Sequence, residues 1–198
     1  MGLIDARRSS VAAALRRGIS VAVVVGGAKE ALDSRPGTND LTLERRLGFI
    51  RLALEHGAKL VPVYSFGETD VFGQLVANPP GSLVRWLQER FLAVFGFTIP
   101  LVSNVVPYRR PITTVIGESI DVPHKPDPTL EDIMEVHHRY VGALQQLYDD
   151  YKNILYTVPH EDLKIVDRLA DADVVKLAAE LPAVNSDEPA YPLLYSRL

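Results

Sequence analysis

The sequence predicts a mixed α/β protein in which a mainly parallel sheet is flanked by helices. Two observations predict this class: short runs of β-branched residues, and longer segments with apolar residues at helical spacing that alternate with those runs. The 198 residues are 47% hydrophobic and 23% charged, which is the balance of an ordinary globular chain. A chain of this length can bury a core without disulfide bonds, and it contains no Cys.

The first strand is expected at residues 19–25, which read ISVAVVV between glycines. A run that is apolar on both faces is typical of a buried central strand with helices on each side. The residues before it, 1–18, are rich in Arg and Ser. They fit a surface helix that leads into the strand, and a transit peptide is the alternative. A short helical turn is expected at 28–32, and Pro36 breaks it.

The next helix is expected at residues 41–56, where apolar side chains recur every three or four positions and charged ones lie between them. Gly57 is a suitable residue to close this helix, because glycine readily adopts the left-handed conformation. Residues 59–64, which read KLVPVY, are expected to form the second strand. The strand–helix–strand order predicts a right-handed crossover between parallel strands.

The second half of the chain continues the alternation. We expect a helix at residues 82–95 and two strand segments, 112–116 and 119–122, on either side of a turn at Gly117. The longest helix is expected to begin after Thr129 and to run to residue 155. Its apolar period is unbroken over this range, and an acidic residue three positions after Thr129 forms a variant of the capping box.

The same patterns divide the chain into two parts. Residues 1–156 are expected to form the main domain. Residues 157–198 are expected to be a helical extension, with a helix at 162–181 followed by a Pro-rich, irregular tail.

Charge and hydropathy narrow the class of function. Twenty-one Lys and Arg against 25 Asp and Glu give a net charge of −4, so the chain lacks the basic excess typical of nucleic-acid-binding proteins. The most apolar stretch, residues 92–102, falls short of the roughly 20 residues that a membrane-spanning helix needs. The four arginines of the first helix either meet anionic lipid headgroups or form a solvated face; they are Arg7, Arg8, Arg16 and Arg17.

Polar and small residues follow each of the first two expected strands. Gly26, Gly27 and Glu30 come after the first strand, and the SFGE sequence, residues 65–68, comes after the second. The carboxyl ends of parallel strands meet at one edge of a sheet, which is where α/β proteins place their sites. Glu30 and Glu68 would then lie at the same edge and polarise a hydroxyl group, or else be neutralised by an arginine such as Arg46.

The histidines do not complete a catalytic set. His137 lies beside the apolar stripe of the long helix, one turn from Tyr140, and this placement is typical of a partly buried, hydrogen-bonded structural histidine. The sequence contains no H-E-x-x-H, G-x-S-x-G, G-x-G-x-x-G or P-loop motif. A nucleotide-binding α/β domain is therefore the weakest of the alternatives.

The motifs taken together resemble a known family. They are GGA-x-E-A, PG, GF, GA-x-LVP and SFGE within residues 23–74, followed by PI-x-x-V-x-G-x-x-I-x-VP and H-x-x-Y within residues 106–152. This combination resembles the type 2 diacylglycerol acyltransferase family, which includes monoacylglycerol and wax-ester acyltransferases. The resemblance covers about seven-tenths of the chain and corresponds to the C-terminal part of that family.

The resemblance implies an acyl-CoA-dependent O-acyltransferase of triacylglycerol synthesis that acts on a glyceride hydroxyl. The implied fold is a glycerolipid-acyltransferase-like core that is incomplete at its N-terminus. No metal and no cofactor are implied, since acyl-CoA is a co-substrate. The implied partners are acyl-CoA, a glyceride acceptor, and the surface of the endoplasmic reticulum membrane or of a lipid droplet; nucleic acid is not among them, and a homo-oligomer is left open.

The resemblance also implies which residues form the site. The GGA-x-E turn matches an acceptor-site block of the wider acyltransferase group, and further family positions fall on an arginine and on SFGE. The expected substrate-binding residues are Gly26, Gly27, Glu30, Arg46, Ser65, Gly67 and Glu68. His137 and Tyr140 match the family's H-x-x-Y and are expected to support the site.

One motif of the family is missing. The His-Pro-His-Gly tetrapeptide, which supplies the catalytic histidine in the family, does not occur in this sequence, so no catalytic residue is assigned. The family's N-terminal membrane hairpin is also missing. A truncated copy of the enzyme is the resulting expectation. The alternative is a non-catalytic partial domain that binds lipid surfaces or a full-length acyltransferase.

Overall fold

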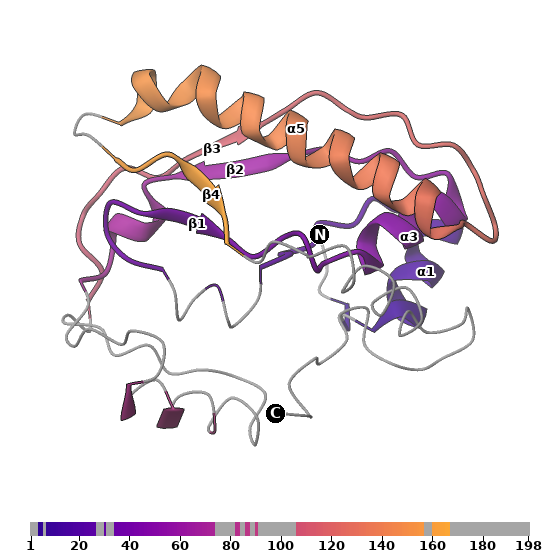
Figure 1. Cartoon of the computed structure of the whole chain (residues 1–198), viewed down its shortest axis with the longest axis horizontal. Helices are drawn as coiled ribbons and strands as arrows, with labels where there is room; N and C mark the ends of the chain where they lie inside the picture. Colours follow the sequence, from indigo (N-terminus) through magenta and orange to yellow (C-terminus); the bar gives the residue numbers. More distant parts are fainter. Residues whose placement is uncertain are drawn as a thin grey trace.

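The computed structural model describes residues 4–5, 7–26, 30, 34–73, 82–83, 86–87, 90, 106–156 and 160–166. It has three α-helices, one short 3-10 helix and four strands within these ranges (Figure 1). The helices are α1 (Arg8–Arg16), α3 (Gly48–His56), η1 (Glu68–Asp70) and α5 (Leu130–Leu155). The strands are β1 (Asn39–Leu41), β2 (Val63–Phe66), β3 (Thr113–Ile116) and β4 (Leu163–Ile165).

The strands form two small sheets of different type. β1 and β4 are parallel, with Asn39 opposite Leu163. β2 and β3 are antiparallel, with Val63 opposite Ile116, and an isolated bridge between Leu60 and Ile120 extends their pairing. Helices together with parallel and antiparallel strands confirm the predicted mixed α/β class.

Helix α5 organises the core. It runs alongside β2 and β3, α3 packs beneath its N-terminal part, and α1 lies below α3 (Figure 1). One stripe of α5 is buried against α3 and against the inner face of β2, which is the arrangement that a 3.6-residue apolar period predicts. The most deeply buried side chains of this core are Leu47, Ile50, Leu54, Phe66, Ile133 and Tyr148.

The start of α5 shows why the long helix forms where it does. The Thr129 hydroxyl accepts a hydrogen bond from the Asp132 N–H at 3.2 Å, and the Asp132 carboxylate accepts one from the Thr129 N–H at 3.0 Å. These two bonds form a capping box that satisfies backbone donors with no partner inside the helix. The helix predicted to begin after Thr129 and to run to residue 155 is confirmed.

Replacing Thr129 with Ala is expected to lower the free energy of unfolding by about 1 kcal/mol, because one helical N–H loses its acceptor. Urea unfolding followed by circular dichroism measures this change. Thr113→Ala is a fair comparison, since Thr113 is exposed on β3 and its side chain forms no hydrogen bond within the described residues. An equal loss in both variants would contradict the capping role.

The same cap is expected to make stability depend on pH. The pKa of Asp132 is lowered, first by its ion pair with Lys125 and then by the hydrogen bond from the Thr129 backbone. Because the folded-state pKa lies below the unfolded value of about 3.9, this contribution is complete above that pH. It is lost as the pH falls through the folded-state pKa. Unfolding curves of the parent and of Asp132→Asn should therefore differ above pH 4 and converge below it.

Two other predictions are confirmed and two are shifted along the chain. Gly57 ends α3 with φ +59°, as expected of a closing glycine, and β3 falls within the strand predicted at 112–116. The helix predicted at 41–56 begins only at Gly48, because the residues before it pair as β1 and then turn. The strand predicted at 59–64 begins at Val63, directly after a proline, which has no N–H to donate to a ladder.

Two further predictions need correction. Residues 19–25 form neither a strand nor a buried segment, since no described strand lies beside them to complete a ladder. The helix predicted at 162–181 is wrong at its start, where β4 pairs with β1 instead; a pairing so distant in the sequence leaves no local periodic signal. Most of the helix predicted at 82–95 and all of residues 167–198 lie outside the described residues, as do most of residues 28–32.

Candidate functional site

The GGA-x-E turn and the arginine expected near it come together in the structure. The Glu30 carboxylate accepts a hydrogen bond from the Thr42 N–H at 2.9 Å, and the Arg46 guanidinium donates one to the Gly26 carbonyl at 3.2 Å. Gly26 is buried, and a Cβ added there would lie 2.1–2.2 Å from the Glu30 carboxylate. A side chain at position 26 would therefore displace this carboxylate from its place beside Thr42. Gly27 lies outside the described residues.

The SFGE segment forms the end of β2 and the turn after it. Ser65 shares a 2.9 Å hydroxyl–hydroxyl hydrogen bond with Thr114 of β3. Gly67 is buried with φ +84°, and a Cβ on it would lie 2.4 Å from the Pro111 carbonyl oxygen. Glu68 is exposed at the start of η1, whereas the Glu30 carboxylate binds the Thr42 N–H. No hydrogen bond joins these two carboxylates within the described residues.

His137 is buried and acts on the arginine segment through the backbone. The residue is 1% exposed, and its Nε2 lies 3.1 Å from the Leu43 carbonyl oxygen. A carbonyl only accepts, so Nε2 carries the proton and donates it. The same carbonyl accepts the Arg46 N–H at 3.0 Å. His137 therefore fixes the turn that carries Arg46, which is the structural, hydrogen-bonded role that the sequence predicts for it.

Tyr140 is held one turn further along α5. Its ring packs edge-on against Phe49 of α3 with centroids 5.1 Å apart. Burial raises the pKa of its hydroxyl. The packing against Phe49 joins α5 to α3.

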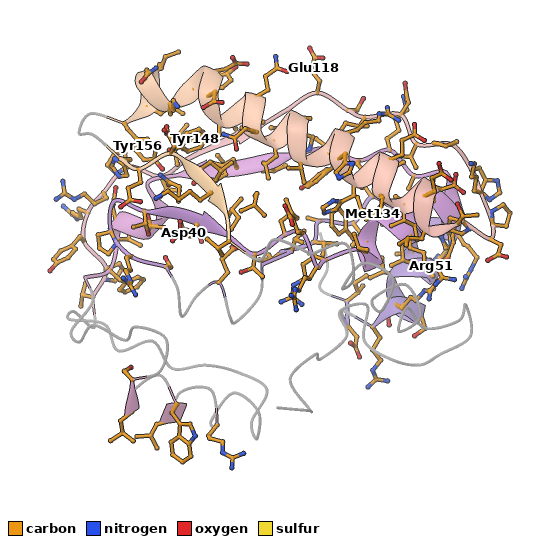
Figure 2. The ribbon with its side chains drawn as sticks, in the orientation of Figure 1. Asp40, Arg51, Glu118, Met134, Tyr148 and Tyr156 are labelled. Atoms are coloured by element: carbon orange, nitrogen blue, oxygen red, sulfur yellow. The ribbon has the colours of Figure 1, made fainter. Side chains whose placement is uncertain are left out.

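A buried polar network lies next to these residues, and sequence reasoning missed it. Asn39 is 2% exposed, and its side-chain oxygen accepts hydrogen bonds from the Tyr64 and Tyr156 hydroxyls at 2.8 and 2.9 Å. Its side-chain nitrogen donates to the Tyr148 hydroxyl at 2.9 Å and to the Glu161 carbonyl. Tyr148 and Tyr156 come from the C-terminal end of α5 and the residue after it (Figure 2). Asn39 thus joins β1, β2, α5 and the start of β4.

The tyrosines link the two predicted motif segments. The pKa of Tyr64 is raised, chiefly by burial, then by Tyr156 and Tyr148, and also by the negative charge of Glu30. The pKa of Tyr156 is raised by burial, and a hydrogen bond from the Gly67 backbone acts in the opposite direction. Glu30 of the first motif and Gly67 of the second therefore both lie close to one hydroxyl cluster.

An Asp–His pair contacts this network through Tyr156. The His160 Nε2 lies 2.7 Å from an Asp70 carboxylate oxygen, and the His160 ring stacks on Tyr156 with centroids 3.7 Å apart. The Gly37 N–H donates to the other Asp70 oxygen at 3.1 Å. The pair is held from three segments of the chain, and it ties η1 to the residues just before β4.

Comparison with known proteins identifies the family of the chain. The sequence profile described as diacylglycerol acyltransferase matches residues 1–166. The chain belongs to the diacylglycerol acyltransferase family. The matched region ends with the last described residue, so the Asn39 network, His160 and β4 all lie within it.

Individual relatives agree with the family match. The chain is 44% identical over 169 residues to diacylglycerol O-acyltransferase 2B of Umbelopsis ramanniana, covering 78% of this chain and 48% of the relative. It is 47% identical over 157 residues to diacylglycerol O-acyltransferase 2 of Dictyostelium discoideum, covering 75% and 47%. It is 41% identical over 152 residues to 2-acylglycerol O-acyltransferase 1 of Bos taurus, covering 72% and 45%.

The chain thus spans about half the length of the curated relatives that it matches. No solved structure is similar to it. None of the helices that the structure describes combines the length and the apolarity needed to cross a bilayer.

Proposed function

We propose that this diacylglycerol acyltransferase family chain serves in acyl-CoA-dependent acylation of a glyceride hydroxyl, as part of triacylglycerol synthesis at the endoplasmic reticulum membrane or a lipid droplet. The relatives' names include both diacylglycerol and 2-acylglycerol O-acyltransferases, so the proposed acceptor is a glyceride. In the reaction the glyceride hydroxyl oxygen attacks the thioester carbonyl carbon. The carbon–sulfur bond breaks, and coenzyme A leaves with the hydroxyl proton.

One observation carries the proposal furthest: the guanidinium that donates to the GGA-x-E turn also has a buried N–H without an acceptor in the described part of the chain. The Nε of Arg46 is buried and has no hydrogen-bond partner among the described residues. A buried N–H without an acceptor costs roughly 1–3 kcal/mol of free energy unless a ligand or a water molecule accepts its hydrogen bond. A carbonyl or phosphate oxygen of the substrates would accept this hydrogen. The same guanidinium donates to the Gly26 carbonyl, and the Glu30 carboxylate lies next to Gly26.

We assign the remaining motif residues to positioning. His137 holds the Leu43 carbonyl and, through it, the backbone of Arg46, while Tyr140 joins the supporting helices. Ser65, Gly67 and Glu68 form the next wall of the proposed substrate site, and Gly27 is assigned to it by its place in the same motif. No described residue is assigned as the base that takes the hydroxyl proton.

The test is a transfer assay with labelled fatty acyl-CoA and diacylglycerol. The chain is assayed alone and together with the part of the Dictyostelium discoideum relative that lies outside the matched region. We expect labelled triacylglycerol and an equal amount of free coenzyme A from the combined proteins. Absence of product in both assays would end the proposal.

Gly26→Ala is expected to lower acyl transfer in that assay by roughly tenfold, the equivalent of about 1.4 kcal/mol in activation free energy. The added methyl group occupies the place of the Glu30 carboxylate and moves it away from Thr42. Gly142→Ala is the matched control, because a Cβ at that exposed position of α5 meets nothing within 4 Å. Unchanged transfer in Gly26→Ala would remove Glu30 from the site.

A second function is favoured by the outer face of the β2–β3 sheet. Val63 and Ile116 lie opposite each other there, 47% and 72% exposed. A non-catalytic domain that binds a lipid surface or a full-length acyltransferase would use such a face. Flotation with lipid droplets supports this function if it is lost in Ile116→Asp, and a protein that stays in the lipid-free fraction excludes the lipid version.

A further inference from the structure

Residues 19–25 have the apolar sequence typical of a buried strand, but several of their side chains are exposed in the structure. Six of the seven side chains are apolar, a pattern typical of a strand covered on both faces. In the structure Ile19, Val23 and Val24 are 48%, 37% and 85% exposed. The difference between pattern and exposure indicates that something other than the described residues covers this segment.

The backbone of the segment is also without partners. The Ile19 N–H bonds to the Ala14 carbonyl, and the Gly26 carbonyl accepts from Arg46. Between these two bonds, the backbone groups of residues 20–25 form no hydrogen bond within the described part of the chain. Six consecutive residues with unpaired N–H and C=O groups are a template for a neighbouring strand.

The segment is nevertheless held in place. Val21 packs against the small core of α1 and α3, and Val25 packs against the main core. Val24, which lies between them, is 85% exposed and belongs to neither core. A segment fixed near both ends has less conformational entropy to lose when a strand pairs with it.

We propose that residues 19–25 are a docking strand for a β-strand from the part of a diacylglycerol acyltransferase chain that this protein does not match. The relatives are about twice as long as the matched region, so the family has a further polypeptide of comparable size. A lipid surface would cover the side chains but has no groups to pair with the backbone, and unpaired backbone groups are costly in hydrocarbon. A β-strand satisfies both requirements at once.

The experiment co-expresses this chain with the part of the Dictyostelium discoideum relative that lies outside the matched region. We expect the two to co-purify and the amides of residues 20–25 to be protected from hydrogen exchange only in the complex. Val24→Asp is expected to weaken the complex by about tenfold to a hundredfold, since a valine lost from an interface costs roughly 1.5–3 kcal/mol. Because Val24 is 85% exposed, this variant leaves the chain's own packing intact.

Ile154→Asp is the matched control. It places the same charge on another exposed apolar residue, 72% exposed on α5, and should leave the affinity unchanged. The proposal is overturned if no complex forms, if the amides stay unprotected in it, or if both variants weaken it equally. It is also overturned if a second copy of the chain or phosphatidylcholine vesicles protect the amides as well. All readouts are of binding, so they stand apart from the transfer assay.

Discussion

Asn39→Ala is expected to lower the free energy of unfolding by roughly 3 kcal/mol or more, because the substitution leaves several buried polar groups unpaired at once. The Asn39 side chain forms four hydrogen bonds, two through its oxygen and two through its nitrogen. The alanine leaves the partly buried hydroxyls of Tyr64 and Tyr156 without their acceptor. Urea denaturation followed by tyrosine fluorescence measures the loss.

Asn153→Ala provides the comparison for this prediction. Asn153 is exposed on α5, so its loss is expected to change the free energy of unfolding by no more than about 0.5 kcal/mol. A cost below 1 kcal/mol for Asn39→Ala would mean that water replaces the amide. The network would then not be the link between β1, β2 and α5 that the hydrogen bonds indicate.

Local sequence patterns predicted the structural features that a few neighbouring residues determine. The capping pair at Thr129, the apolar stripe of α5 and the closing glycine of α3 are each read from a few neighbouring residues, and all three are confirmed. The network around Asn39 could not be found in this way. Its partners Tyr148 and Tyr156 lie 109 and 117 residues away, and no spacing within a motif marks a contact over such a distance.

The candidate site likewise contains contacts that local motifs predicted and contacts between distant residues that they did not. The GGA-x-E turn and Arg46 were expected together from their motifs, and the structure joins Gly26 with Arg46. His160 pairs with Asp70 across 90 residues, and no local pattern in the sequence marks that contact. The strand predicted at 19–25 is wrong for a different reason. Its local pattern is that of a strand, but the described residues contain no neighbouring strand that pairs with it.

The turn after β2 gives the second large expected effect. Gly67→Ala is expected to cost roughly 3 kcal/mol or more of the free energy of unfolding, for two separate reasons. An L-residue at φ +84° costs about 1–2 kcal/mol, and the new Cβ would lie 2.4 Å from the Pro111 carbonyl oxygen, a backbone atom that cannot rotate away. Since the Gly67 backbone also bonds to Tyr156, relief of the clash would disturb the tyrosine network.

Gly37→Ala separates the two reasons. Gly37 has φ +79°, almost the same as Gly67, but a Cβ there meets nothing within 4 Å. Its alanine variant should therefore show only the conformational cost of about 1–2 kcal/mol, and the difference between the two variants measures the clash. Equal losses in urea denaturation would mean that the Pro111 segment yields freely. In that case the turn after β2 would tolerate an added methyl group, and Gly67 would be needed only for its positive φ angle.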